Sequence, residues 1–257
     1  MTKKLPNIIS KLAPFISIAV IFIIWLFVSE GGLVPAYMLP SPVDVLKAFV
    51  NDMPILLHHA SITLQEAIYG LIIGIIMAFV IATLMDRFPF IYKAVYPLLV
   101  ITQTIPTIAI APLLVLWLGF EMAPKIALVI ITTFFPITIS LLDGYRSADV
   151  DAINLIRSMG GGRLKIFRYI KLPSAMNHFF SGLKVSASYA IVGAVISEWL
   201  GGFEGLGVYM TRVKKAYAFD KMFAVIIFIS IISLLLMLGI SLLRTVCMPW
   251  EKRSKST

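Results

Sequence analysis

The chain has few charged residues and almost no cysteine. Asp, Glu, Lys and Arg make up 14% of its 257 residues, and Cys247 is the one cysteine. A single cysteine excludes a disulfide within the chain and a cysteine metal cluster. The adjacent His58 and His59 belong to no His-Glu-x-x-His spacing, and we expect both at the surface or at a membrane interface. The sequence therefore predicts no metal site.

Motifs for covalent chemistry are also missing. The chain contains no Gly-x-x-x-x-Gly-Lys-Ser/Thr phosphate loop and no Gly-x-Ser-x-Gly nucleophile elbow. The glycine-rich residues 201–207 are not a dinucleotide fingerprint, because no strand–helix–strand unit surrounds them. We therefore expect that the chain is not an enzyme and cannot hydrolyse ATP through a phosphate loop.

Apolar residues dominate instead. They make up 60% of the sequence, and the mean hydropathy is +0.96. Soluble proteins have roughly 45–50% apolar and 25% charged residues, so this composition indicates an all-α integral membrane protein with one domain over residues 1–257. The net charge of +9 could suggest a nucleic-acid partner, but the basic residues cluster beside apolar segments. Membrane topology explains that clustering better than nucleic-acid binding.

Six apolar stretches are expected to cross the membrane, the first being short for a span of about 20 residues. They are residues 14–29, 62–85, 95–118, 126–142, 179–199 and 222–243. The first lacks a small-residue cleavage site and is interpreted as an uncleaved helix. Residues 43–50 are expected to form a short interfacial helix. Gly70 and Gly74, four residues apart, permit close helix packing in the second span.

Charge placement gives an orientation. Fifteen of the 22 Lys and Arg residues lie in segments on the side of the two termini, which predicts that both termini are cytoplasmic. Lys125 is expected outside. Glu66, Lys184 and Glu198 lie near span ends, where Lys184 can reach the inner surface and Glu198 the outer. The fifth span carries the most polar residues and should face the protein interior. Composition alone is also compatible with an ion-coupled secondary transporter or channel. The small number of ionisable groups in the spans argues against that alternative.

Polar residues within the spans are candidates for lining a solute path. The third span contains Pro97, Pro106 and Pro112, and proline bends a helix and frees a carbonyl group. Such irregularity at membrane depth occurs where the backbone is buried in protein or lines a wet cavity, so path lining and simple packing both remain open. The candidate path residues, from the third and fifth spans, are Gln103, Thr104, Thr107, Ser188 and Ser197.

The longest polar interval, residues 149–173, begins with a predicted helix. Ala152, Leu155, Ile156 and Met159 recur at i, i+3, i+4 and i+7, which is one apolar stripe on a helix of roughly ten residues. Asp149 suits the start of this helix, and three glycines from Gly160 onward suit its end. Because so short a helix is marginal alone, its stripe must dock either on its own bundle or on a partner protein.

The same interval resembles a family signature. Gly160, nine residues, Ile170, any residue and then Leu172-Pro173 is similar to the second half of the EAA loop of ATP-binding-cassette (ABC) importer permeases. In that family the loop, here about residues 143–178, contains a coupling helix that sits in a groove of the ATPase subunit.

The first half of the signature departs from the family pattern, because Asn154-Leu155-Ile156 stands where Glu-Ala-Ala is usual. Leu155 and Ile156 keep an apolar docking face, while the usual glutamate is replaced by Asn154. The residues that the resemblance assigns to ATPase coupling are Asn154, Leu155, Ile156, Arg157, Met159, Gly160, Arg163, Ile170, Leu172 and Pro173.

The resemblance extends over about residues 60–250 and is strongest to permeases for sulfonates, taurine, nitrate and pyrimidine precursors of thiamine. It is carried by segments such as Leu116-Trp117-Leu118-Gly119 and Gly144-Tyr145-Arg146-Ser147. It implies a type I importer permease fold in a bacterial cell membrane and import of a small organic solute by alternating access. The anionic and the pyrimidine solutes both remain open.

The resemblance also implies partners. They are a second permease copy, usually identical, two cytoplasmic ATPase subunits that carry ATP and magnesium, and an extracytoplasmic substrate-binding protein. No cofactor is expected in this chain. The predicted outer basic cluster of Arg212, Lys214 and Lys215 suits either an anionic solute or an acidic binding protein.

Overall fold

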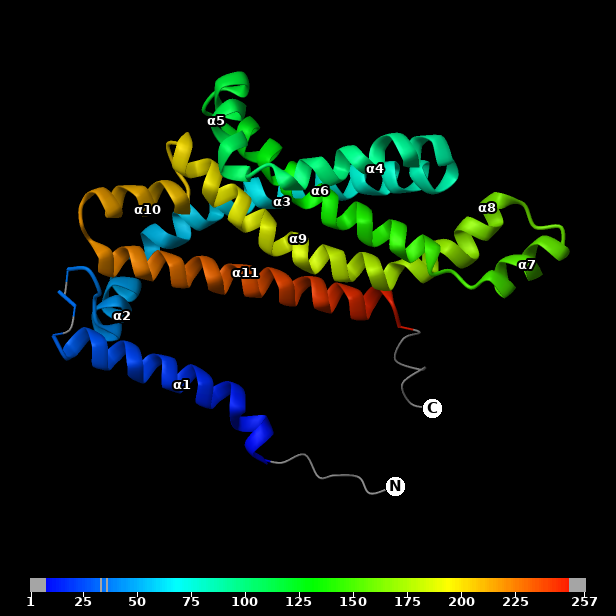
Figure 1. The fold of residues 1–257 in the computed structure, drawn as a ribbon. Helices are drawn as coiled ribbons and strands as arrows, with labels where there is room; N and C mark the ends of the chain where they lie inside the picture. The colour runs from blue at the N-terminus through cyan, green and yellow to red at the C-terminus, as the bar shows by residue number, and fades with distance from the viewer. Residues whose placement is uncertain (1–7, 33, 36, 250–257) are drawn as a thin grey trace. The chain divides into compact units, whose positions relative to one another are not determined.

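All the regular secondary structure in the described residues is helical. The computed structural model describes residues 8–32, 34–35 and 37–249, so Lys3, Lys4, Lys252, Arg253 and Lys255, used above to predict orientation, lie outside it. The helices (Figure 1) are α1 (Ile8–Glu30), α2 (Pro42–Asn51), α3 (Met53–Arg87), α4 (Pro89–Thr104), α5 (Thr107–Leu118), α6 (Met122–Arg146), α7 (Val150–Ser158), α8 (Arg163–Ile166), the π-helical turn η1 (Phe167–Lys171), α9 (Leu172–Leu200), α10 (Leu206–Lys215) and α11 (Phe219–Cys247).

The predicted third span is two helices and not one. Five of the described helices are long and apolar enough to cross a membrane, and α4 and α5 count as a sixth span only as a pair bent by 101°. The break follows from Pro106, which disfavours helical geometry in the residue before it. Ile105 is accordingly extended, with φ −83° and ψ 122°. The span expected over residues 95–118 is therefore this bent pair, and it is interrupted at Pro106, one of the prolines expected to bend it.

The helix ends extend beyond the predicted spans. The fifth span was expected to begin at residue 179, but α8, η1 and α9 form one continuous helix from Arg163 to Leu200. The second span begins at Met53 instead of residue 62. Hydropathy ends a span where charged residues begin, whereas a helix can continue past the bilayer with those side chains in water or paired. The predicted loop over residues 143–178 is therefore largely helical.

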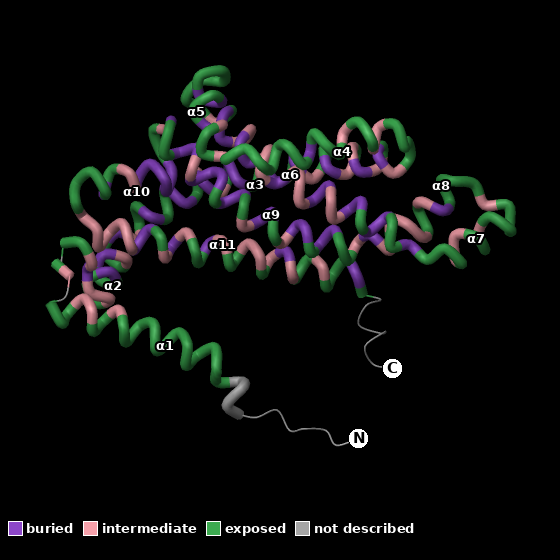
Figure 2. Tube along the Cα trace, in the orientation of Figure 1, coloured by how far each residue is buried: buried purple, intermediate pink, exposed green. Residues whose placement is uncertain are grey.

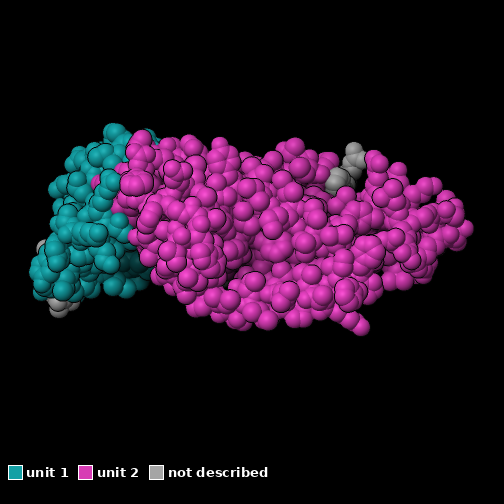
Figure 3. All heavy atoms as spheres, turned by 90° about the horizontal axis from the view of Figure 1, so that it is seen from above, with its two compact units in different colours: residues 1–57, 210–228 teal, residues 58–209, 229–257 magenta. Residues whose placement is uncertain are grey.

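The chain divides into two compact units (Figure 3). The described parts of residues 1–57 and 210–228 form one, and those of 58–209 and 229–257 form the other. In the first unit, Val45 and Ala48 of α2 pack with Ala224 of α11. Ser41 caps α2 by accepting a hydrogen bond from the Asp44 backbone N–H at 3.2 Å. The short helix predicted over residues 43–50 is therefore present as α2.

Glycines hold the helices of the second unit close together. A methyl group added at Gly144 of α6 would lie 2.5 Å from the Ala175 Cα of α9. One added at Gly70 of α3 would lie 2.5 Å from the Val129 Cβ of α6, and one at Gly74 would lie 2.6 Å from the Thr133 hydroxyl. The prediction that Gly70 and Gly74 serve helix packing is thus confirmed.

The helix that contains α9 is the most buried of the long helices (Figure 2). In its most apolar window, 61% of the residues are buried, against 39% in α6 and 33% in α3. The prediction that the fifth span faces the protein interior is confirmed.

Two charged residues near span ends are buried where the sequence predicted exposure. Lys125 donates to Glu66 Oε1 at 2.7 Å, and their side chains are 6% and 0% exposed. Glu198 is 2% exposed and accepts hydrogen bonds from the Thr63 hydroxyl at 2.7 Å and the Gly207 N–H at 2.6 Å. Glu198 therefore does not reach the outer surface as expected, and Lys125, expected in an outer segment, is buried in protein at the start of α6. An intramembrane charge is costly unless it is paired, and each has found a partner on another helix or turn.

The two adjacent histidines differ from each other in burial. His58 is exposed, as predicted, but His59 is buried. The His59 ring stacks on Tyr209 at 5.4 Å between centroids, and its Nδ1 accepts the Gly205 N–H at 3.1 Å. His59 therefore helps to satisfy the turn between α9 and α10, and the prediction of a surface position is wrong for it.

We predict that Gly144→Leu destabilises the protein by about 1–3 kcal/mol, because the new side chain overpacks the contact with Ala175. Gly239 of α11 is the matched control, since no atom lies within 4 Å of a methyl group added there. Midpoints of thermal unfolding in detergent should fall for Gly144→Leu and stay unchanged or rise for Gly239→Leu. Equal midpoints for the two variants would contradict the close packing of α6 on α9.

We predict that Lys125→Met lowers the free energy of unfolding by about 3–5 kcal/mol, because it leaves the Glu66 carboxylate buried without its cation. The double variant Glu66→Gln/Lys125→Met should recover most of that loss. Denaturant or thermal unfolding of the three proteins measures this, and a double variant no more stable than Lys125→Met would sink the explanation.

Candidate functional site

The short helix α7 has the ends that the sequence predicted. Asp149 Oδ1 accepts the Asp151 N–H at 2.8 Å and so caps the helix. Gly160 has φ +75°, the left-handed conformation that glycine adopts without a Cβ clash. The Gly161 N–H then donates to the Ile156 carbonyl at 2.8 Å, which satisfies one of the last carbonyl groups of the helix. The chain therefore stops α7 sharply and turns back into α8.

No residue of α7 is buried by the described part of the chain. Leu155 and Met159 of the apolar stripe are 61% and 78% exposed, and Ala152 and Ile156 are half-buried. The polar candidates Asn154 and Arg157 are also exposed. The described bundle therefore covers the stripe only in part. Leu155 and Met159 remain available to a partner.

A π-helical turn joins α8 to α9. The Leu172 N–H donates to the Phe167 carbonyl, five residues back, where an α-helix would use the fourth. Pro173 is the next residue, and it has no N–H to donate to the helix. The hydrogen-bond pattern therefore changes directly before the position where proline removes a backbone donor. The Leu172-Pro173 end of the signature thus has a structural effect that needs no partner. Ile170 and Leu172 are half-buried, while Arg163 and Pro173 are exposed.

Two contacts fix this turn to the ends of α3 and α6, and a third joins those two helices to each other. Lys171 Nζ lies 2.6 Å from Asp86 Oδ1 at the end of α3. The Phe167 ring packs on Tyr145 of α6 at 5.4 Å between centroids, and the Tyr145 hydroxyl lies 3.3 Å from that of Thr83. Sequence reasoning assigned no role to these residues. The segment that contains Tyr145 was part of the resemblance, but its partners are far away in the sequence.

The candidate path residues do not share one surface. Gln103 and Thr104 are exposed at the end of α4, and Thr107 is half-buried at the start of α5, so these three flank the helix break. Ser188 and Ser197 are nine residues apart on α9, which places them on opposite faces of the helix. Path lining by both sets stays a prediction.

The two serines also differ in their contacts. The Ser188 hydroxyl lies 3.2 Å from the Met237 sulfur on α11. The Ser197 hydroxyl is buried without a hydrogen-bond partner among the described residues. A solute path along one side of α9 can therefore contact only one of these two serines.

The described residues offer an exposed binding surface on α7. No three His, Cys, Asp or Glu side chains in this part of the chain are grouped closely enough to hold a metal ion. An exposed apolar helix on a firmly held turn is instead suited to insertion into a groove of another protein.

Known proteins show the same sequence pattern. Residues 70–249 match the family described as binding-protein-dependent transport system inner membrane component. A Haemophilus influenzae protein named "Probable ABC transporter permease protein" is 36% identical over 90% of this chain and 95% of its own length. The formylaminopyrimidine transport permease ThiX of Halalkalibacterium halodurans is 32% identical over 94% of this chain and 97% of its own. The Escherichia coli taurine permease TauC is 25% identical over 91% and 88%.

The fold also matches solved structures. An amino acid ABC transporter crystallised with histidines superposes with a TM-score of 0.55 at 19% identity, over 79% of this chain and 96% of that one. The resemblance seen in the sequence is thereby confirmed, including the type I importer permease fold, and an ATPase and a binding protein are the partners that it implies. The chain belongs to the family of binding-protein-dependent transport system inner membrane components, and it is a multi-pass membrane permease subunit of an ABC importer.

Proposed function

We propose that this chain imports a small organic solute by alternating access, driven by ATP hydrolysis on separate subunits to which α7 couples it. One observation carries the proposal: α7 is a capped helix with an apolar stripe whose Leu155 and Met159 its own bundle leaves exposed. ATP binding closes the paired ATPase subunits, α7 moves with them, and the spans reorient so that the path opens outward. Hydrolysis resets the inward-facing state. ATP and magnesium are held by the ATPase subunits, and the covalent step occurs there.

The apolar stripe of α7 is the proposed ATPase contact. Leu155, Ile156 and Met159 enter the groove of the ATPase, and Gly160 lets the chain turn away at its edge. Asn154, Arg157 and Arg163 add hydrogen bonds at the rim. With Asn154 in place of the usual glutamate, this contact carries no negative charge at that position, so the docking here relies more on burial of the apolar stripe.

The π-helical turn passes the movement of α7 to the bundle. Ile170, Leu172 and Pro173 belong to this turn or follow it directly, and Lys171 ties it to Asp86. A shift of α7 that passes through the Gly160–Gly162 turn therefore reaches both α9 and the cytoplasmic end of α3.

The proposed orientation has both termini in the cytoplasm, so that α7 faces the ATPase subunits. Two permease copies, most simply identical, enclose the path with two ATPase subunits inside and a binding protein outside. The basic residues Arg212, Lys214 and Lys215 then lie on the outer side.

The helix break between α4 and α5 is the proposed place where the solute passes. Gln103, Thr104 and Thr107 surround it, and Ser188 and Ser197 are further candidates. Relatives at 32% and 25% identity are named for a formylaminopyrimidine and for taurine, which differ in charge. The solute proposed here is therefore a small sulfonate-, taurine- or nitrate-like anion or a pyrimidine precursor of thiamine.

Two experiments test this function. Mild-detergent pull-down of the chain from its own cell should recover an ATPase subunit, and uptake should stop when ATP is depleted. Competition of that uptake by taurine and by a formylaminopyrimidine then separates the two solute classes. Recovery of the chain alone, with uptake that follows an ion gradient and ignores ATP, would refute the proposal.

We predict that Leu155→Gln lowers recovery of the ATPase subunit at least about tenfold, since an apolar contact worth about 1.5–3 kcal/mol is lost. Val150→Gln is the matched control, because Val150 is 65% exposed and lies on the opposite face of the same helix. Pull-down with each variant measures the difference. If both substitutions reduce recovery equally, the stripe is not the docking face.

We predict that Gly160→Val reduces ATP-driven uptake severely, because a branched side chain opposes the left-handed conformation at φ +75°. Gly160→Asn should retain more activity, since asparagine tolerates this conformation better. Gly162→Val serves as control, because Gly162 has φ −75° and no atom within 4 Å of an added methyl group. Normal uptake by Gly160→Val would show that the turn after α7 is not required for coupling.

A further inference from the structure

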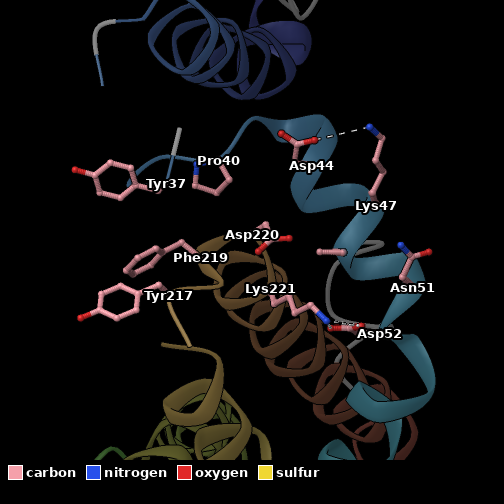
Figure 4. A pocket seen from close by; sticks show the side chains of 11 residues that line it. Tyr37, Pro40, Asp44, Lys47, Asn51, Asp52, Tyr217, Phe219, Asp220 and Lys221 are labelled. Atoms are coloured by element: carbon pink, nitrogen blue, oxygen red, sulfur yellow. Dashed lines mark hydrogen bonds and ion pairs between the residues drawn. The ribbon is translucent and has the colours of Figure 1, made fainter. Parts of the chain in front are cut away.

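A cavity of about 370 Å³ lies within the unit formed by the described parts of residues 1–57 and 210–228 (Figure 4). This volume is at the lower end of the range for small-ligand sites. The coupling helix and the path residues are all in the other unit. The lining residues are Tyr37, Pro40, Asp44, Lys47, Ala48, Asn51, Asp52, Tyr217, Phe219, Asp220 and Lys221.

Three aromatic rings form one side of this cavity. Figure 4 shows Tyr37, Tyr217 and Phe219 together on one side, with Lys47, Asn51 and Asp52 on the other. Tyr37 and Tyr217 are 63% and 78% exposed, and the rings of Tyr217 and Phe219 meet edge to face at 6.3 Å. The rings therefore present their surfaces to the opening instead of filling a core.

Tyr217 is held in an unfavourable backbone conformation. Its φ of +57° is the one positive value among the non-glycine residues that the structure describes. Bulky side chains rarely adopt this conformation, and such strain often occurs at ligand sites. The turn between α10 and α11 thus places an aromatic ring at the cavity at a cost in backbone energy.

The charges around the cavity leave one carboxylate without a cation. Lys47 lies 3.8 Å from Asp44, and Lys221 lies 2.9 Å from Asp52. Asp220 has neither an ion pair nor a hydrogen bond among the described residues, and Figure 4 shows it between the aromatic side and α2. With three carboxylates and two ammonium groups, the lining carries one net negative charge.

We propose that this cavity binds an organic cation, with an ammonium or guanidinium group held against Tyr37, Tyr217 and Phe219 and balanced by Asp220. Aromatic faces attract such cations through their quadrupole, and desolvation in a cavity strengthens that attraction. One uncompensated carboxylate fits one positive charge, whereas an anion would meet that carboxylate directly. Lys214 and Lys215 of the outer basic cluster are not among the lining residues.

The cation could be a free solute or the headgroup ammonium of a phosphatidylethanolamine lipid. Binding of labelled choline and labelled arginine to the full chain in phosphatidylglycerol nanodiscs tests the site, because that lipid offers no ammonium group. Asp220→Asn should raise the Kd at least about tenfold, which is about 1.4 kcal/mol, and Tyr217→Leu should raise it several-fold. Glu30→Gln, a carboxylate of the same unit outside the lining, should change the Kd less than about twofold.

A neutral competitor checks that charge is recognised. 3,3-Dimethylbutan-1-ol has the shape of choline without its charge, and it should not displace labelled choline. Replacing part of the lipid by phosphatidylethanolamine identifies the source: loss of choline binding indicates the headgroup, and unchanged binding indicates a free solute.

The proposal is overturned if neither choline nor arginine binds saturably in phosphatidylglycerol nanodiscs, or if Asp220→Asn and Tyr217→Leu both bind as the unaltered chain does. Equal competition by the neutral alcohol would also overturn it. Each variant must elute as a single species before it is scored, so that a folding defect is not mistaken for lost binding. Either result leaves the coupling proposal untouched, because that proposal concerns residues of the other unit.

Discussion

The close approach of α6 to the helices on both sides is the constraint on which the second unit depends. Gly144 brings α6 against Ala175 of α9, and Gly70 brings α3 against Val129 of α6. Burial of apolar side chains does not drive helices together in lipid, because the lipid tails are equally apolar. Small residues instead let the helix backbones approach closely enough for van der Waals packing. Two further contacts tie the same helices to the π-helical turn: Tyr145 of α6 packs on the Phe167 ring, and Asp86 of α3 pairs with Lys171. The turn that joins α8 to α9 is therefore supported by packing between these helices.

What the sequence could predict was mostly local. The limits of α7 follow from Asp149, from a 3.6-residue apolar period and from Gly160, and all three act within about ten residues of one another. The spans are similarly visible as long apolar runs. The interruption at Pro106 was also visible, but its angle was not, since proline only removes a hydrogen bond and restricts Ile105. The 101° bend depends on what the two resulting helices pack against.

What the sequence could not predict was long-range pairing. Lys125 and Glu66 are 59 positions apart, and Thr63 and Glu198 are 135 apart. The sequence-based expectation for charged residues near span ends assumes that their side chains reach water. That expectation fails when a neighbouring helix supplies a hydrogen-bond or ion-pair partner for the buried charge. The contact that holds the π-helical turn was missed for the same reason, because Lys171 and Asp86 are 85 positions apart. The aromatic cavity was missed because the left-handed conformation of Tyr217 has no pattern in the sequence.

The unbroken helix from Arg163 to Leu200 has a mechanical consequence. Its 38 residues, at 1.5 Å each, make a rod of about 57 Å, longer than a hydrocarbon core of about 30 Å. Tilting such a rod by about 5° around one end displaces the other by about 5 Å, roughly the pitch of one helical turn. A small tilt at the Leu200 end of this helix and a displacement of several ångströms at its Arg163 end, next to the turn that follows α7, are then one rigid-body motion, with leverage set by helix length.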